Sequence, residues 1–99
     1  MATSYPAFFG YWLYVSKVSR SGDILSIVFN ERAVVEKVGS AIPIEVRLYN
    51  LETGQSRIDP YQWPDEVRIQ LQYKGLRSYR WQITIVIDKV LAYSASVAP

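Results

Sequence analysis

The feature that most constrains the fold is a strict alternation of apolar and polar residues in the C-terminal third of the chain. Every second residue is apolar over residues 67–73, and the same period of two resumes over residues 79–87. Successive side chains of a β-strand point to opposite faces, so this period is typical of a strand with one buried face. The intervening segment contains Gly75, which adopts positive φ without penalty, and predicts a turn.

Pairing these two strands as a hairpin would fix their register, because directly opposed residues share a face. The apolar sets meet in three cross-strand pairs: Tyr73 with Tyr79, Leu71 with Trp81, and Ile69 with Ile83. The other face of the hairpin then carries only polar and basic side chains: Arg68, Gln70, Gln72, Arg80, Gln82 and Thr84. We therefore expect a hairpin with an aromatic and isoleucine face toward the core and a polar, basic face toward solvent.

Three further segments read as strands. Residues 42–48 alternate in the same way, with Thr53 and Gly54 in the turn that follows. Residues 11–15 and 24–29 are apolar on both faces and are joined by a turn at 19–23. Antiparallel strands with one face in water should alternate, so we expect both faces of these two to be covered.

One segment reads as a helix. Asn30 is a suitable N-cap, Val34, Val35 and Val38 form one apolar stripe, and Gly39 marks a stop. The tail from 88 to 96 is compatible with a strand or with a short helix. The sequence as a whole, residues 1–99, predicts a single, mainly β domain: a twisted antiparallel sheet of about five strands with one short helix near residues 30–38.

The composition excludes several classes of function. The 99 residues contain no histidine and no cysteine, which removes zinc fingers, disulfide frameworks, cysteine nucleophiles and histidine-based relays. The five glycines are isolated, so no phosphate-binding loop is present. The N-terminal region lacks a basic start, and its apolar run over 7–15 is far shorter than the ~20 residues of a membrane helix. We expect an intracellular, soluble protein with no metal or cofactor.

Acid–base chemistry would depend on carboxylates alone. Asp59, Asp65 and Glu66 lie close together in the sequence around two prolines, and a carboxylate pair in one cleft can act as acid and base. A solvated, proline-stiffened loop is the simpler reading, since nothing in the spacing makes these side chains converge. The expectation is that the protein is not an enzyme.

Two kinds of binding surface remain as candidates. Residues 67–87 hold four basic residues and no acidic one, which favours contact with nucleic-acid phosphates. The net charge of the whole chain is only +2, however, which is lower than is typical of nucleic-acid-binding proteins. The candidate phosphate-binding residues are Arg68, Lys74, Arg77 and Arg80. Aromatic residues beside prolines or in the doubly apolar strand are either core residues or anchors for a protein partner. The candidate anchors are Tyr11, Trp12, Tyr14, Tyr61 and Trp63. Strands that are apolar on both faces suggest a core completed by a second copy, so we expect a homodimer.

The runs SYPAFFGYWLYVSK and DPYQWPDEVRIQLQYKGLRSYRWQITIVIDK, in a chain without histidine or cysteine, resemble a small uncharacterised protein of archaeal filamentous viruses, the lipothrixviruses, with relatives in rudiviruses. The resemblance implies a thermostable, acid-stable viral protein located in the archaeal host cytoplasm or the virion. It implies no catalytic motif. The expected function is that of a non-enzymatic accessory or assembly protein that acts through protein–protein contacts as a homodimer. The alternative is a nucleic-acid-binding protein that uses the basic hairpin face.

Overall fold

Seven β-strands make up the fold in a computed structural model, which describes residues 12–32, 42–63, 66 and 70–99. The described part of the chain contains no helix, and so no helix long and apolar enough to cross a membrane. The strands are β1 (Trp12–Ser21), β2 (Ile24–Arg32), β3 (Ile42–Asn50), β4 (Ser56–Trp63), β5 (Gln70–Tyr73), β6 (Trp81–Ile87) and β7 (Val90–Val97).

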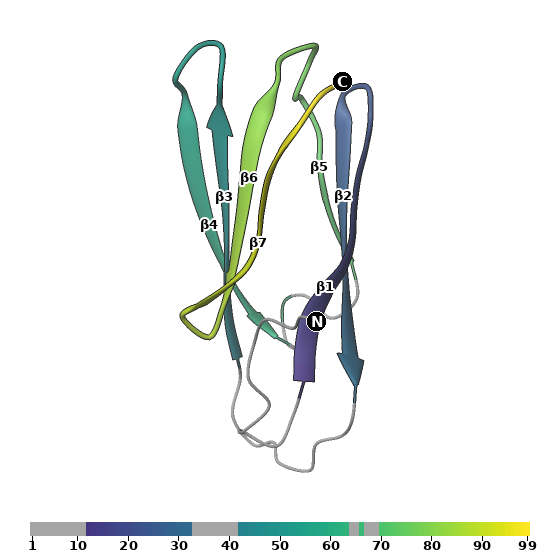
Figure 1. The fold of residues 1–99 in the computed structure, drawn as a ribbon, viewed down its shortest axis with the longest axis vertical. Helices are drawn as coiled ribbons and strands as arrows, with labels where there is room; N and C mark the ends of the chain where they lie inside the picture. The colour runs from purple at the N-terminus through teal and green to yellow at the C-terminus, as the bar shows by residue number, and fades with distance from the viewer. Residues whose placement is uncertain (1–11, 33–41, 64–65, 67–69) are drawn as a thin grey trace.

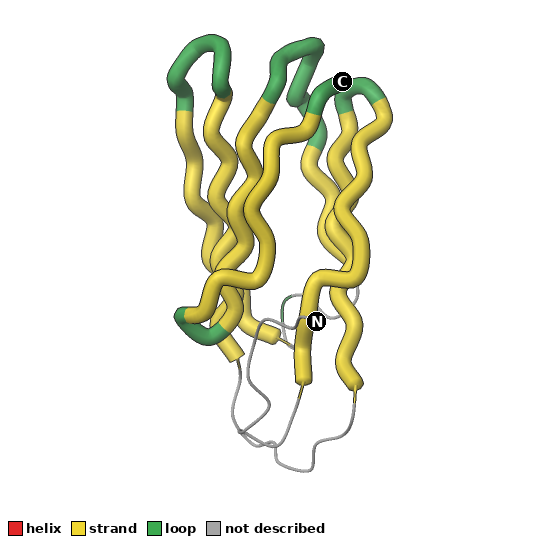
Figure 2. The backbone as a smooth tube through the Cα atoms, viewed as in Figure 1, coloured by secondary structure: helices red, strands yellow, loops and turns green. Residues whose placement is uncertain are grey.

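The strands form two antiparallel sheets that face each other (Figure 1). One sheet has three strands in the order β1-β2-β5, and the other has four in the order β4-β3-β6-β7. The chain passes from one sheet to the other after β2, after β4 and after β5, so both layers are built from distant segments (Figure 2). A three-stranded sheet that faces a four-stranded one is a β-sandwich, in which the inner faces of both sheets form the core.

The core lies between the two sheets and is built from the inward side chains of each strand. The alternation over 42–48 is confirmed, since Ile42, Ile44, Val46 and Leu48 are all buried. In β6 the alternate residues Trp81, Ile83, Ile85 and Ile87 are buried in the same way. The three-stranded sheet contributes Leu25, Ile27 and Phe29 from β2. The fully buried side chains of the opposite sheet include Ile44, Val46, Ile83 and Ile85.

The predicted hairpin of residues 67–73 with 79–87 is wrong. β5 pairs with β2, where Tyr73 lies opposite Leu25, whereas β6 pairs with β3 and β7 in the other sheet. The predicted partners Leu71 and Trp81 therefore belong to different layers, and Ile69 lies outside the described residues. Alternation correctly indicates that Trp81 faces the core, but it carries no information on which strand lies alongside.

The predicted number of strands is also wrong, because β4 and β7 add to the expected five. Residues 56–63 form β4 where a loop was expected, and the tail that was compatible with a strand or a helix forms β7. Asn30 does not cap a helix: it lies within β2, opposite Tyr14. The remainder of the predicted helix, residues 33–38, lies outside the described residues.

The two predicted N-terminal strands are confirmed, and the turn between them is shorter than the expected 19–23 because β1 continues to Ser21. β1 and β2 form a hairpin that turns at Gly22, where φ is +60°. The expected covering of both faces holds only for the inner one: outward-facing Ile24 is 36% exposed, and Val28 is partly buried. The apolar side chains on the outer face of β2 therefore lie at the surface, and no further part of the described chain covers them.

Candidate binding surfaces

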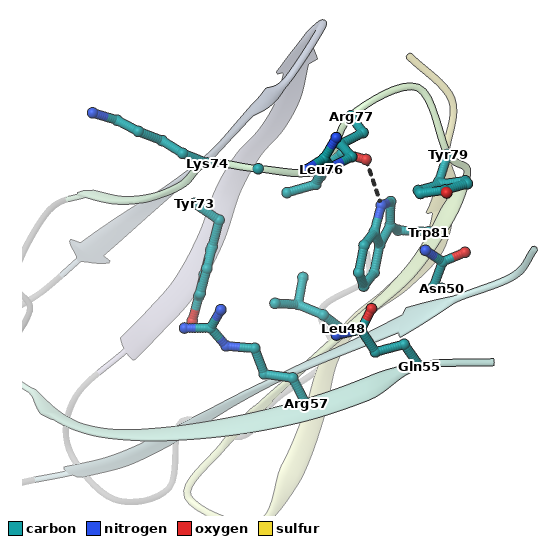
Figure 3. Close-up of a pocket in the computed structure, with 11 residues that line it drawn as sticks. Leu48, Asn50, Gln55, Arg57, Tyr73, Lys74, Leu76, Arg77, Tyr79 and Trp81 are labelled. Carbon is teal, nitrogen blue, oxygen red and sulfur yellow. Dashed lines mark hydrogen bonds between the residues drawn. The ribbon is translucent and has the colours of Figure 1, made fainter. Parts of the chain in front are cut away.

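The connection between β5 and β6, residues 74–80, crosses from one sheet to the other at one end of the sandwich. It forms the wall of a cavity of about 160 Å³ that extends down between the sheets (Figure 3). Leu48 and Leu76 line the cavity together with the aromatic residues Tyr73, Tyr79 and Trp81. The indole Nε1 of Trp81 donates a hydrogen bond to the Leu76 carbonyl at 3.1 Å, which fixes the indole ring against the connection.

The turn of the β1–β2 hairpin holds the connection in place through Asp23. The Asp23 carboxylate accepts hydrogen bonds from the backbone N–H of Gly75 (3.0 Å) and of Arg77 (2.5 Å), and its carbonyl accepts one from Leu76 (3.2 Å). The hydrogen bond from Arg77, followed by that from Gly75, lowers the pKa of Asp23 below its usual value. Asp23 thus acts as a local cap for a segment that belongs to no strand.

Arg20 reinforces the same region from β1. Its guanidinium donates hydrogen bonds to four backbone carbonyls: Gly22 at 2.7 Å, Tyr79 at 2.5 Å, Arg77 at 2.6 Å and Val97 at 3.2 Å. These carbonyls belong to the β1–β2 turn, the connection and the end of β7. Arg20 therefore ties both sheets together at this end, and partial desolvation lowers its pKa while the nearby Asp23 opposes that shift.

The backbone of the connection adopts conformations that need such support. Gly75 has a φ of +83°, which glycine adopts without cost, but Arg77 has a φ of +58°, in the left-handed region that non-glycine residues seldom occupy. Two of the hydrogen bonds described above, to Asp23 and Arg20, involve the backbone of Arg77. Strained residues held in this way are typical of sites where a loop must keep one shape.

Three cations lie around the cavity: Arg57 from β4, and Lys74 and Arg77 from the connection. Nε of Arg57 donates to the Asp59 carboxylate at 2.8 Å, and its guanidinium lies 5.3 Å from the centre of the Tyr73 ring. Figure 3 shows Lys74 directed away from the cavity. All three side chains are exposed, and no acidic residue lines the cavity itself.

A buried tyrosine hydroxyl lies on the β4 side of the cavity. The hydroxyls of Tyr61 and Tyr73 are 2.8 Å apart, and Tyr73 is only 6% exposed. Burial, followed by the hydrogen bond to Tyr61 and the negative charge of Asp59, strongly raises the pKa of Tyr73. The Tyr73 phenol stays protonated and serves as a fixed hydrogen-bonding group.

A buried amide completes the lining. Asn50 is 1% exposed, and its Oδ1 accepts hydrogen bonds from the backbone N–H of Glu52 (2.8 Å) and Thr53 (3.0 Å). These contacts use the oxygen to shape the β3–β4 turn. Figure 3 shows the amide nitrogen turned toward Trp81, and this nitrogen donates no hydrogen bond to any residue of the described ranges.

The basic residues predicted from sequence are only partly brought together. Lys74 and Arg77 lie at the cavity rim, and exposed Arg80 follows them on the same connection, where its backbone N–H donates to the Glu52 carboxylate at 2.8 Å. Arg68 lies outside the described residues. The expected polar face does not exist as one surface, because Gln72 lies on the three-stranded sheet and Gln82 on the four-stranded sheet.

The aromatic candidates for partner contact occupy different environments. Tyr61 and Trp63 are partly buried at positions of β4 that pair with the inward residues of β3, along the edge of the core. The hydroxyl of Tyr14 accepts a hydrogen bond from Asn30 at 2.9 Å. Trp12 pairs with Arg32 at the start of β1, and Tyr11 lies outside the described residues.

The carboxylates considered for catalysis do not form a group of three among the residues described. Asp59 is paired with Arg57, and the carboxylate of Glu66 accepts a hydrogen bond from the backbone N–H of Gln62 at 2.8 Å. Asp65 lies outside the described ranges. Each of the two described carboxylates thus has a structural contact of its own.

The outer face of the four-stranded sheet is a second candidate surface. Its three most exposed large apolar side chains are Ile58 (57%), Leu91 (55%) and Tyr49 (46%). The charged residues in the middle of this face, Glu45 and Arg47, form an ion pair at 2.6 Å and neutralise each other. Below we call this surface, with these five residues, the outer face.

A shallow groove of about 410 Å³ runs along the same side of the sheet. Pro43, Pro60 and Val86 line it together with the Glu45–Arg47 pair and Lys89. The groove and the outer face form one continuous area, because Glu45 lies opposite both Pro60 and Val86 in the sheet.

Sequence reasoning missed Arg20, Arg57 and Asn50, which shape the cavity. They come from β1, β4 and the end of β3, and no local pattern links them. One signal was present: Asn50 precedes the Thr53–Gly54 turn, and asparagine before a turn often accepts hydrogen bonds from the backbone that follows.

Comparison with known proteins adds no identification: no family model, curated protein or solved structure matches the chain.

Proposed function

We propose that this chain is a non-enzymatic protein-interaction module that acts as a homodimer, through contact between the outer faces of two copies. In the viral setting that the sequence resemblance implies, such a dimer would serve as an accessory or assembly protein. The exposure of Ile58, Leu91 and Tyr49 on one sheet face is the observation that carries the proposal.

The composition of the outer face supports contact with protein. Ile58, Leu91 and Tyr49 share one sheet face, on which they lie around the Glu45–Arg47 pair. Exposed apolar area on one face of a sheet is typical of interaction sites. Pro43 and Pro60 add rigid apolar area beside these side chains, and the groove makes the surface concave at this point. Burial of Ile58 and Leu91 at an interface would contribute ~1 kcal/mol or more each, since more than half of each side chain is exposed.

A second copy suits this face because its charges are balanced within one chain. The Glu45–Arg47 pair is internally neutral, so two identical faces meet without net repulsion. A two-fold axis would also place each Glu45 within reach of the partner's Arg47, and a self-complementary patch is what a two-fold interface requires. On the opposite sheet, Ile24 is the one exposed large hydrophobic residue among the side chains that the structure describes.

The test is the mass of the protein in solution, measured by sedimentation equilibrium over a range of concentrations. Wild type should be a dimer at micromolar concentration, and Ile58→Glu and Leu91→Glu should each shift it toward monomer by about tenfold or more in dissociation constant, because a buried charge is costly. Ile24→Glu is the matched control, on the other sheet, and should remain dimeric. A wild-type monomer at all concentrations, or equal dissociation of the control, would refute the proposal.

Nucleic-acid binding is the second candidate. Lys74, Arg77 and Arg80 are exposed on one connection, and none of these side chains donates a hydrogen bond within the described part of the chain. Binding of a fluorescent single strand should weaken steeply with salt, and each substitution by glutamine should reduce the salt dependence by about one phosphate contact. Affinity that is absent at low salt, or insensitive to salt, would exclude this function.

A further inference from the structure

We propose that the cavity beneath the β5–β6 connection binds a small aromatic anion: a phosphate monoester carried on a single ring. The ring would lie between the sheets and the phosphate at the rim. This inference is independent of the proposed dimer, because the cavity is at the end of the sandwich and shares none of its lining residues with the outer face as defined above.

The size and lining of the cavity fit one ring. A volume of about 160 Å³ is close to that of a ~150 Å³ protein cavity that accommodates benzene. Leu48 and Leu76 provide apolar walls, and the indole of Trp81 and the ring of Tyr73 flank the space (Figure 3). Aromatic walls of this kind favour a flat, apolar group by offset or edge-to-face stacking.

The rim supplies donors for an anion. Arg57 uses only its Nε in the contact with Asp59, so both terminal nitrogens of the guanidinium can donate to one phosphate. Arg77 lies across the rim with a side chain that donates no hydrogen bond to the described residues. The side-chain amide of Asn50, which lines the cavity, offers a further, uncharged donor.

The local charge favours a dianion over a single negative charge. Five cations lie at this end of the molecule, namely Arg20, Arg57, Lys74, Arg77 and Arg80. Three carboxylates stand against them: Asp23 of the β1–β2 turn, Asp59 beside Arg57, and Glu52, which accepts a hydrogen bond from the Arg80 backbone N–H. The difference is two positive charges, which a phosphate monoester would balance and a carboxylate would balance only by half.

The site is also preorganised. Arg20 and Asp23 fix the connection by hydrogen bonds to its backbone, and the strained φ of Arg77 is maintained by those contacts. Because the connection is already ordered before a ligand binds, little of the binding free energy is lost in ordering it. The cavity, the excess of positive charge, the amide that lines the cavity and the fixed wall together support the proposal.

The experiment is a titration of the isotope-labelled full chain with phenyl phosphate, followed by two-dimensional ¹H–¹⁵N NMR. Saturable shifts are expected at the indole N–H of Trp81 and the backbone amides of Gly75 and Arg77, with little change on the outer face. Inorganic phosphate should bind more weakly at the same residues, and benzyl alcohol, which lacks the charge, should bind more weakly still.

Variants distinguish binding in the cavity from non-specific attraction of phosphate to the basic connection. Arg57→Gln and Arg77→Gln should each weaken phenyl phosphate by about tenfold, as expected for loss of a hydrogen bond to a charged group. Arg80→Gln is the matched control, an exposed arginine on the same connection that does not line the cavity. Asn50→Asp retains the oxygen that caps the β3–β4 turn but places a negative charge in the cavity, and should abolish binding.

Several results would overturn the proposal. These are the absence of saturable shifts at millimolar phenyl phosphate, equal affinity for benzyl alcohol, or equal weakening by Arg80→Gln and Arg77→Gln. The last would indicate contact with phosphate along the basic connection, as in the nucleic-acid candidate. If Asn50→Asp fails to fold, the Arg57 and Arg77 variants still decide the outcome, since both side chains are exposed.

Discussion

The hydroxyl of Tyr61 lies 2.8 Å from the hydroxyl of Tyr73 and thereby joins the edges of the two sheets. Tyr61 belongs to β4, the edge of the four-stranded sheet, and Tyr73 to β5, the edge of the three-stranded one. No backbone ladder connects these strands, so side chains close this side of the sandwich. Arg57, stacked over Tyr73 and paired with Asp59, extends the same closure toward the cavity.

The energetic value of this contact can be measured with a double-mutant cycle. Tyr73→Phe should lower the free energy of unfolding by about 1 kcal/mol, and Tyr61→Phe by about 1–2 kcal/mol, because it leaves the buried hydroxyl of Tyr73 with fewer partners. The double variant should lose less than the sum, with a coupling of about 0.5–1.5 kcal/mol. Strict additivity in urea unfolding would show that the hydroxyls do not interact.

Alkaline pH should weaken the fold through Tyr73. Its pKa is raised in the folded state, so the folded chain retains a proton that the unfolded chain releases. Stability from this group is complete below the unfolded pKa near 10 and is lost as the pH rises above it, by up to about 1.4 kcal/mol per pH unit. Tyr73→Phe should show a shallower decline between pH 10 and 12 by denaturant unfolding. An unchanged slope would contradict this assignment.

Acid should loosen the β5–β6 connection through Asp23. The pKa of this carboxyl is lowered by the amides of Arg77 and Gly75, so the unfolded chain takes up a proton before the folded chain does. Its contribution to stability is present above its usual pKa near 3.8 and is lost as the pH falls through the lower folded value. The protection factors of the Gly75 and Arg77 amides against hydrogen exchange, that is, their rates relative to the unstructured chain at the same pH, should fall over that range.

Asp23→Asn provides the control for this effect. An asparagine accepts fewer of the two amide hydrogen bonds, so the protection factors of Gly75 and Arg77 should be low at neutral pH and change little on acidification. If the variant follows the wild-type pH profile, another carboxylate is responsible.

Engineered cysteines distinguish the observed sheet order from the simple hairpin. Ser26 and Gln72 are directly opposed in β2 and β5, and Nε2 of Gln72 lies 3.4 Å from Oγ of Ser26. Since the natural chain has no cysteine, Ser26→Cys with Gln72→Cys should form an intramolecular disulfide on mild oxidation. Gln70→Cys with Gln82→Cys, a pair that the hairpin would bring together, should stay reduced. Mass spectrometry after alkylation detects the disulfide in either variant. A disulfide between positions 70 and 82, and none between 26 and 72, would support the simple hairpin instead.

Alternation in the sequence was sufficient to predict which side chains enter the core. Ile44, Val46, Ile83 and Ile85 are all buried as their period of two indicates. Their strand neighbours were not predictable in this way, because every inward face of a sandwich has the same pattern. β4 escaped detection for a different reason: its inward positions hold Arg57, Asp59 and Tyr61, which are polar or amphipathic and cover only the edge of the core.

The candidate site was less predictable than the fold. Lys74 and Arg77 were recognised as basic residues, but their role in the cavity depends on Arg57, which is brought alongside by the sheet order. The apolar outer face was hidden because Ile58 lies on β4, where a loop was expected, and Leu91 on β7, for which the sequence left strand and helix open. Local patterns report burial, whereas sites of this kind depend on long-range pairing.

The pairing of β2 with β5 has a consequence for how the chain folds. The paired residues Ser26 and Gln72 are 46 residues apart in the sequence, and the paired strands β3 and β6 are likewise separated by a long stretch of chain. Contacts between distant residues are slow to form because the intervening chain loses loop entropy before they are made. We expect refolding on the millisecond-to-second scale, and we expect fragments that end before β5 to remain unstructured, since neither sheet exists until most of the polypeptide has been made.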